Sequence, residues 1–215
     1  HQIVGHIKQD SPFCPNIAAS PDGRQVWLTL KDIGRVMVFD AKPPFSVLRT
    51  IDTGPLTNHV NFAKTMAGTF AYVTVGGLDA IKVFRTDTFE QTALIPVGKL
   101  PHGLWPSGDG TRIYVGIENA DKVAAIDTAT NQVIAEISVG QAPQALVYVP
   151  RAVRADEGTS GLQPLGVAGK ASLLSLTAVG PSATERGTSV SLFDQGLTQV
   201  LQAAVAGLEP RKPYA

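Results

Sequence analysis

Short apolar runs separated by turn-forming residues recur along the first two thirds of the chain. The runs at 26–30 (VWLTL), 71–75 (AYVTV) and 113–117 (IYVGI) are rich in β-branched and aromatic residues. Clusters of Gly, Asn, Asp or Pro interrupt such runs every 8 to 12 residues, and helical spacing of apolar residues is absent from this region. The pattern predicts antiparallel strands joined by tight turns.

The middle strands of this pattern are apolar at nearly every position. The segments VMVF (36–39) and VAAI (123–126) show no alternation between apolar and polar residues. Strict alternation would indicate one face in water, whereas continuous apolarity indicates a sheet covered on both faces. Blades of a β-propeller are covered in this way, because each one packs between two neighbours.

The strands belong to a repeat. Aligning residues 24–40, 69–85 and 111–127 places three aromatic side chains in one column at steps of 45 and 42, namely Trp27, Tyr72 and Tyr114. Further columns begin the next strand (Val36, Ile81, Val123), close it (Asp40, Arg85, Asp127) and supply a later glycine (Gly54, Gly98, Gly140). A unit of 42 to 45 residues is the period of a four-stranded propeller blade. We expect the aromatic column to pack between blades and not to bind a ligand.

The turns agree with hairpins. In SPDGR (20–24) and SGDGT (107–111), a glycine stands where a tight turn needs positive φ, and the aspartate before it is suited to capping the turn. In DTATNQ (127–132), Asn131 stands where the left-handed region is tolerated best by asparagine.

These residues carry a family resemblance. AYVTV, together with KVAAIDTATNQVIAEISVGQAPQALVYV (122–149), resembles the YVTN-type β-propeller repeat over about residues 2–149. The namesake asparagine is replaced by Val75 and Ile117, and the first unit has DAKPPFSV (40–47) in place of Asp-Thr-Ala-Thr-Asn. The resemblance implies a propeller of about seven blades. It further implies an exported protein, either periplasmic or at the bacterial cell surface, as in surface layers, but no shared activity.

The predicted fold class is all-β, and residues 1–153 are assigned to propeller repeats. The units are about 15–57, 58–100 and 101–142, with partial blades at both ends: 1–7 resembles an outermost strand and 143–149 an innermost one. Three units are too few to close a ring without exposing a sheet edge. We therefore expect the chain to be part of a longer protein, or to close with other copies.

The repeat pattern ends after residue 153, and the composition of the chain changes. Residues 154–161 are polar and glycine-bearing, which is typical of a linker, and 162–215 form a β-rich segment with strands expected at 171–179 and 188–194. Residues 196–215 fit a helical stripe or a strand, of which we favour the strand. The ending VAGLEPRKPY (205–214) is similar to the tyrosine corner of fibronectin-III-like sandwiches, in a form truncated before the last strands.

Composition limits the classes of binding partner and of metal site that the chain can have. Lys and Arg number 18, as do Asp and Glu, so no net charge would attract nucleic acid, and no apolar run approaches the roughly 20 residues of a membrane span. Cys14 is the single cysteine, which excludes an internal disulfide and a zinc site built from several thiolates. A polyanion is therefore not expected as a partner, and we expect a protein, a glycan or a small molecule instead.

Polar residues recur where each unit enters its innermost strand. They are Asn16, His59, His102 and Gln144, at steps of 43, 43 and 42. In a propeller they would lie at one rim of the central channel. Three roles remain open: satisfying backbone groups, contacting a ligand or cofactor, and binding a metal. Two histidines without a third ligand in register do not make a metal site, so we assign no metal and favour the structural role.

The loops between the second and third strands are predicted to open on the same rim. They carry charges of both signs, at Lys31, Asp32, Arg35, Asp79, Glu118, Asp121 and Lys122, beside Asn119. We include Asp79 and Asp121 among the candidate ligand-binding residues. Such charges suit recognition of a polar ligand, and they suit plain solvation equally well.

Catalytic signatures are absent: the chain has no Gly-x-Ser-x-Gly, phosphate-binding Gly-x-x-x-x-Gly-Lys or His-Glu-x-x-His motif. The sequence therefore favours a non-catalytic exported scaffold that binds a ligand at the channel rim and requires no cofactor. The alternative is an enzyme or redox protein similar to haem-binding nitrite reductase propellers or propeller lactonases. LPHGLW (100–105) would then place His102 toward a haem or metal.

Overall fold

The structure is a computed structural model that describes residues 2–150, 172–176, 188–195 and 198–204. The chain divides into two units, 1–150 and 151–215, and each is described by itself. Within the described residues no helix is long and apolar enough to cross a membrane.

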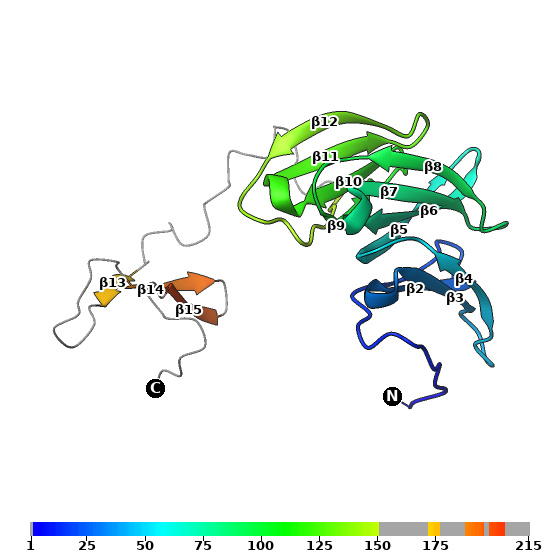
Figure 1. Ribbon diagram of the computed structural model, residues 1–215, viewed down its shortest axis with the longest axis horizontal. Coiled ribbons are helices and arrows are strands. Elements are labelled where there is room, and N and C mark those ends of the chain that lie inside the picture. The colour runs from blue at the N-terminus through cyan, green and yellow to red at the C-terminus, as the bar shows by residue number, and fades with distance from the viewer. Residues whose placement is uncertain (1, 151–171, 177–187, 196–197, 205–215) are drawn as a thin grey trace. The chain divides into compact units, whose positions relative to one another are not determined.

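The first unit contains three four-stranded sheets, which Figure 1 shows as a blue, a cyan-to-green and a green-to-yellow layer. Blade 1 consists of β1 (Ile17–Ala19), β2 (Gln25–Leu30), β3 (Arg35–Asp40) and β4 (Val47–Asp52). Blade 2 consists of β5 (Thr57–Thr65), β6 (Gly68–Val75), β7 (Ala80–Arg85) and β8 (Gln91–Pro96). Blade 3 consists of β9 (Pro101–Pro106), β10 (Arg112–Ile117), β11 (Lys122–Asp127) and β12 (Gln132–Ser138).

Every blade is an antiparallel sheet whose strands pair in chain order. The helices described are three short 3₁₀ turns between the second and third strands, η1 (Lys31–Ile33), η2 (Gly76–Leu78) and η3 (Glu118–Ala120). The all-β fold class and the repeated four-stranded sheet are thus confirmed in this unit. The sheets have the form of propeller blades.

The aromatic column predicted from the repeat is confirmed by strand register. Trp27 pairs with Val38, Tyr72 with Val83 and Tyr114 with Ala125, so each aromatic residue occupies the same position of the second strand. Trp27 and Tyr72 are completely buried, and Tyr114 is half-buried.

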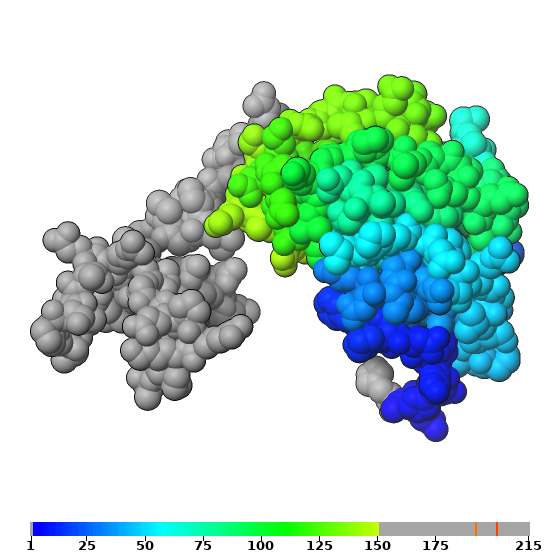
Figure 2. All heavy atoms as spheres, in the orientation of Figure 1, coloured from blue at the N-terminus to red at the C-terminus, as the bar shows by residue number. Residues whose placement is uncertain are grey.

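Two apolar cores join the blades. The space-filling view shows the three blades in contact as successive layers (Figure 2). The core between blades 1 and 2 contains Trp27, Val36, Val38, Val60, Phe62, Ala71, Val73, Val75 and Phe84. The core between blades 2 and 3 contains Ala63, Tyr72, Ile81, Val83, Ile95, Val97, Leu104, Ile113, Val115, Ile117, Ala124 and Ile126. Strands that are apolar at nearly every position therefore contribute side chains to the cores on both faces of a blade, as the sequence pattern indicates.

The outer face of blade 1 is covered by the segment that precedes it. Ile7 and Cys14 pack there against buried Leu30, Met37 and Phe39. The strands expected within 1–7 and at 143–149 are not formed in the described residues, since neither segment is assigned to a strand. A strand requires a ladder partner, and no further blade in the described chain supplies one.

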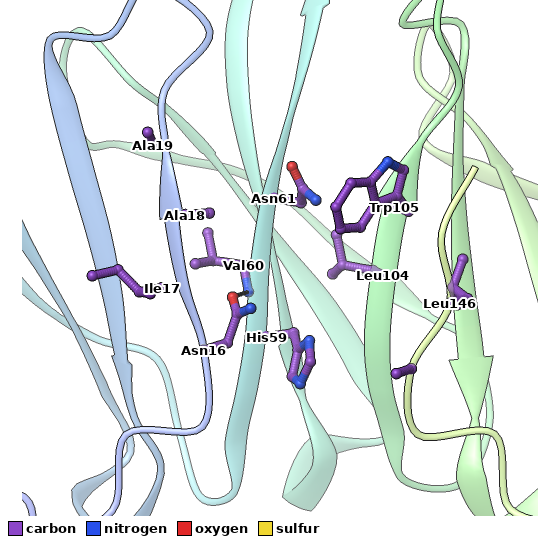
Figure 3. A pocket seen from close by; sticks show the side chains of 11 residues that line it. Asn16, Ile17, Ala18, Ala19, His59, Val60, Asn61, Leu104, Trp105 and Leu146 are labelled. Atoms are coloured by element: carbon purple, nitrogen blue, oxygen red, sulfur yellow. Dashed lines mark hydrogen bonds between the residues drawn. The ribbon is translucent and has the colours of Figure 1, made fainter. Parts of the chain in front are cut away.

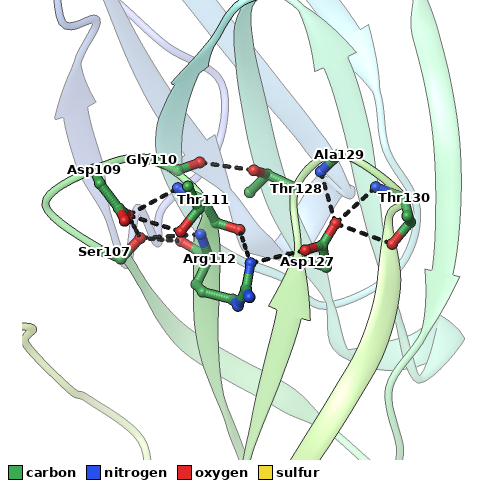
Figure 4. A network of polar contacts seen from close by, with 9 residues as sticks. All are labelled: Ser107, Asp109, Gly110, Thr111, Arg112, Asp127, Thr128, Ala129 and Thr130. Carbon is green, nitrogen blue, oxygen red and sulfur yellow. Dashed lines mark hydrogen bonds and ion pairs between the residues drawn. The ribbon is translucent and has the colours of Figure 1, made fainter.

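The hairpin turns of blade 3 are held by carboxylates (Figure 4). Asp109 accepts hydrogen bonds from the Ser107 hydroxyl at 2.6 Å and from the amide and hydroxyl of Thr111 at 3.0 and 2.8 Å. Asp127 accepts from the amides of Ala129 and Thr130, while Arg112 donates to its second oxygen at 2.7 Å. The capping role predicted for these turns is therefore present.

The second unit contains one described sheet, of strands β13 (Ser172–Leu176), β14 (Thr188–Gln195) and β15 (Thr198–Ala204). The expected strands at 171–179 and 188–194 and the strand interpretation of the segment after 196 are confirmed over these ranges. The linker at 154–161 and the tyrosine corner at 205–214 lie outside the described residues.

Candidate functional site

The first strands of the three blades lie next to one another and surround a hollow. Residues of β1, β5 and β9 line it together with Ala145 and Leu146, and its volume is about 360 Å³ (Figure 3). In a propeller this surface is the wall of the central channel. Because the first strand of each blade faces the hollow, side chains from distant parts of the sequence meet there.

Both histidines lie inside strands and not in the loops that precede them, and each occupies a β-bulge. In β5 two residues, Asn58 and His59, stand opposite Thr74 alone. In β9 two residues, His102 and Gly103, stand opposite Gly116 alone. His59 is the second residue of its bulge and His102 the first, so the alignment of the two in one column is wrong by one residue.

The Thr74 hydroxyl holds the bulge of β5 and connects it to blade 3. It accepts a hydrogen bond from the His59 amide at 2.8 Å and donates to the His102 carbonyl at 2.6 Å. Thr29 makes the corresponding contacts to the amide and carbonyl of Asn16, at 3.1 and 3.0 Å, within blade 1. The repeat already indicated this shared role, because the two threonines occupy the same position of the repeated strand, in VWLTL (26–30) and AYVTV (71–75).

The rings of His59 and His102 face one another across the boundary of blades 2 and 3. Their centroids are 4.9 Å apart and their planes are inclined by 55°. Nδ1 of His102 lies 2.9 Å from the Gln144 carbonyl oxygen. Burial, the nearby His102 and the positive Lys31 together lower the pKa of His59 to about 4, so this ring is neutral near pH 7.

Asn16 and Gln144 are largely engaged in holding the backbone. The Asn16 side-chain oxygen accepts a hydrogen bond from the Val60 amide at 2.9 Å, which links blades 1 and 2. The Gln144 backbone carbonyl accepts a hydrogen bond from the Gly103 amide at 3.0 Å. The side-chain nitrogen of Gln144 donates to the Glu118 carboxylate at 2.8 Å. Thus Asn16 performs the structural role that the sequence favours, while it also lines the hollow.

Asp79 and Asp121 hold the connections between blades. The Asp79 carboxylate accepts from the Leu100 amide at 3.0 Å, and the Asp121 carboxylate accepts from the Ala142 amide at 2.9 Å. Both residues have positive φ, 53° and 54°, at the position that Gly34 occupies in blade 1 with a φ of 65°. Neither aspartate lines the hollow beside His59. Their geometry supports a structural role.

Two residues of the hollow were missed by sequence reasoning, Asn61 and Trp105. They lie side by side on β5 and β9 in Figure 3. Trp105 is 40% exposed, and it also lines a second hollow of about 490 Å³ with Phe62, Lys64 and Tyr148. The signal available was alternation along the strand. Asn61 lies between buried Val60 and Phe62, and Trp105 follows buried Leu104, so each side chain is on the opposite face of its strand from these neighbours.

The arrangement can bind by stacking and hydrogen bonding. Within the described residues, no group of three or more His, Cys, Asp or Glu side chains is placed to hold a metal ion.

Cys14 is free and half-buried against blade 1. Burial, and to a smaller extent the negative charge of Asp32, raises the pKa of its thiol. A reactive thiolate is therefore not favoured there.

Comparisons with known proteins define the fold only. No family model matches the chain, and a search of curated proteins finds no match. Among solved structures, a chain of "Kuenenia stuttgartiensis Hydrazine Synthase" is similar, with a TM-score of 0.59 and 21% sequence identity over 90% of this chain. The match covers 49% of that chain, so the present sequence spans about half its length. At this identity the likeness supports the propeller-like fold of repeated four-stranded sheets and no activity.

Proposed function

We propose that this chain is part of an exported, non-catalytic β-propeller that binds a small polar ligand or a glycan at the inner surface of its blades. The observation that carries the proposal is the hollow between β1, β5 and β9, where exposed Trp105 stands beside Asn61 and His59. An aromatic face flanked by a few polar groups is typical of sites for small ligands.

The bonding of the polar groups supports a binding role for part of this surface. The Asn61 side-chain oxygen accepts from the Phe62 amide at 2.9 Å, which leaves its amide hydrogens directed to other acceptors. The indole of Trp105 offers a broad apolar face with one N–H donor. Thus a ring compound with hydroxyl groups would find both a stacking surface and hydrogen-bonding partners.

The family and location belong to the same proposal. The recurring strand, turn and glycine columns resemble the YVTN-type repeat, whose members are commonly surface-layer, periplasmic or otherwise exported proteins. The balanced charge supports a partner other than nucleic acid. The blades beyond these three would come from the rest of a longer chain or from other copies.

Tryptophan fluorescence tests the ligand site directly. The chain has two tryptophans, Trp27 completely buried and Trp105 exposed, so quenching by acrylamide reports mainly on Trp105. We would titrate this chain with a panel of oligosaccharides. A binding oligosaccharide should protect Trp105 from the quencher.

The matched controls are Trp105→Ala, which should abolish the response, and Asn61→Ala, which should weaken it. The proposal would be contradicted if no oligosaccharide in the panel changed the quenching. It would also be contradicted if binding measured by calorimetry persisted unchanged in Trp105→Ala.

A second function is favoured by the histidine pair. Two imidazoles on one channel wall also suit a redox or hydrolytic propeller, as the resemblance to haem-binding nitrite reductase propellers and propeller lactonases implies. A visible absorption spectrum and lactonase assays of the native protein test this alternative, which a colourless, inactive protein would contradict.

A further inference from the structure

We propose that His59 and His102 together bind one divalent ion of the late first transition row, such as Zn²⁺, through their two imidazoles. The two rings come from neighbouring strands, β5 and β9, and their centroids are 4.9 Å apart. This inference departs from the sequence-based expectation, which assigned no metal because no third ligand is in register. It also goes beyond the proposed ligand site, with which it shares His59 but neither Trp105 nor Asn61.

The spacing of the rings is that of two ligands on one ion. With Zn–N bonds of about 2.0–2.1 Å and tetrahedral angles, two imidazoles have centroids roughly 5 Å apart. Packed aromatic rings have centroids at similar distances and are commonly tilted, so the hydrogen bonding of His102, and not the inclination of 55°, distinguishes this pair. The separation of the rings is therefore compatible with both imidazoles binding one common ion.

The hydrogen bonding of His102 prepares it as a ligand. The Gln144 carbonyl oxygen, 2.9 Å from Nδ1, can only accept a hydrogen bond, so Nδ1 carries the proton. Nε2 of the neutral ring is then left with a lone pair. A carbonyl that fixes the tautomer and orientation of an imidazole is the arrangement found behind metal-bound histidines in general.

The surroundings determine how tight such a site is. His59 is half-buried and lines a hollow with room for water, which would complete the coordination shell. Because no third His, Cys, Asp or Glu joins the pair in the described residues, two or more positions stay open to water or to an anionic group of a ligand. The positive charge of Lys31 near His59 opposes binding, so we expect a weaker site than a structural zinc centre.

Calorimetric titration with Zn²⁺, and optical titration with Co²⁺, test the proposal. All proteins would carry His1→Ala, which removes a competing imidazole at the start of the chain. We expect one ion per chain and a Co²⁺ spectrum of low coordination number. His59→Asn and His102→Asn should each weaken binding about tenfold or more. His6→Ala, which alters an exposed histidine outside the pair, should leave the affinity unchanged.

The result that would overturn the proposal is the absence of Zn²⁺ binding, or binding that neither asparagine variant weakens. An equal loss in His6→Ala would overturn it as well. Circular dichroism checks that each variant folds, and ring-nitrogen NMR of the unmutated pair gives an independent readout, in which Zn²⁺ should shift Nε2 of His102. Failure here leaves the Trp105 quenching experiment untouched, so the two proposals fail separately.

Discussion

The two interfaces between blades use the same column of the repeat in different ways. Between blades 1 and 2, Trp27 packs edge-on against Phe62, with ring centroids 5.8 Å apart and planes at 87°, and within 6.4 Å of Phe84 and 6.1 Å of Phe89. Its indole N–H donates to Gln25, whose own amide donates to the carbonyl of Thr86 in blade 2. The first interface is thus an aromatic cluster with its polar tip satisfied.

The second interface, between blades 2 and 3, contains aliphatic side chains in place of this aromatic cluster. The ring completely buried there is that of Tyr72, whose hydroxyl is hydrogen-bonded. The hydroxyl of Tyr72 donates to the side-chain oxygen of Asn131 in blade 3 at 3.0 Å. Burial, with the charge of Asp127, raises the pKa of Tyr72 to about 12, so the hydroxyl keeps its proton. The comparison shows that the column determines where a large ring packs against the neighbouring blade, whereas the partner of its polar end differs. That partner is Gln25 of the same blade for Trp27 and Asn131 of the neighbouring blade for Tyr72.

The largest effect is expected from emptying the first interface. Trp27→Ala should lower the free energy of unfolding by about 3–5 kcal/mol, because it removes a completely buried ring and leaves a cavity. Urea unfolding at pH 7 measures it. Tyr114→Ala is the control from the same column, since Tyr114 is half-buried and stacks on Tyr148 alone. Equal losses in the two variants would break the comparison.

The next effect separates a turn that touches a neighbouring blade from one that does not. Gly23 and Gly110 hold the same place in the first hairpins of blades 1 and 3, with φ of 68° and 72°. An added Cβ meets nothing within 4 Å at Gly23, whereas at Gly110 it would lie 2.5 Å from the Lys64 carbonyl oxygen of blade 2.

Gly23→Ala should therefore cost only the strain of a left-handed alanine, about 1–2 kcal/mol in unfolding free energy. Gly110→Ala should cost roughly 1–3 kcal/mol more, since backbone must move. Thermal or urea unfolding of both variants measures the difference. A cost at Gly110 no greater than at Gly23 would show that blades 2 and 3 separate without loss.

A third variant tests the polar link at the inner edge of the second interface. Thr74→Val removes the buried hydroxyl that joins the bulge of β5 to the His102 carbonyl, and should cost about 1–3 kcal/mol in unfolding free energy. Thr29→Val is its control, because the Thr29 hydroxyl bonds only to Asn16 of its own blade. We expect faster hydrogen exchange at β9 in Thr74→Val alone, and the same exchange in both would contradict the link.

Local patterns predicted the blades well because each strand and turn depends on residues next to it. The column of Trp27 and Tyr72 and the turn around Gly110 follow from composition and spacing. The site was predicted less well, because it depends on register across strands. A bulge shifts a side chain by one position, so His102 and His59 meet without being equivalent, and Trp105 emerges only once its pairing with Tyr114 is known.

The smallest effect we expect is a pH dependence that distinguishes the two capped turns. Three hydrogen bonds from Ser107 and Thr111 lower the pKa of Asp109 to about 2, whereas in the turn of blade 1 Asp22 has bonds from Ser20 and Arg24 and a pKa that is lowered from its ordinary value. A carboxylate with a lowered native pKa stabilises the fold fully above its unfolded value, near pH 4, and loses this contribution as the pH falls toward 2.

Asp109→Asn should therefore lower the melting temperature at pH 7, and the difference from the unmutated protein should shrink between pH 4 and 2. Asp22→Asn should show the same trend with a smaller amplitude, because Asp22 lacks the third bond that the Thr111 hydroxyl gives to Asp109. Scanning fluorimetry across this range measures both. A gap that stays constant with pH would mean that the asparagine disturbs the turn through its shape, since a change of shape does not titrate whereas the loss of a hydrogen-bonded carboxylate does.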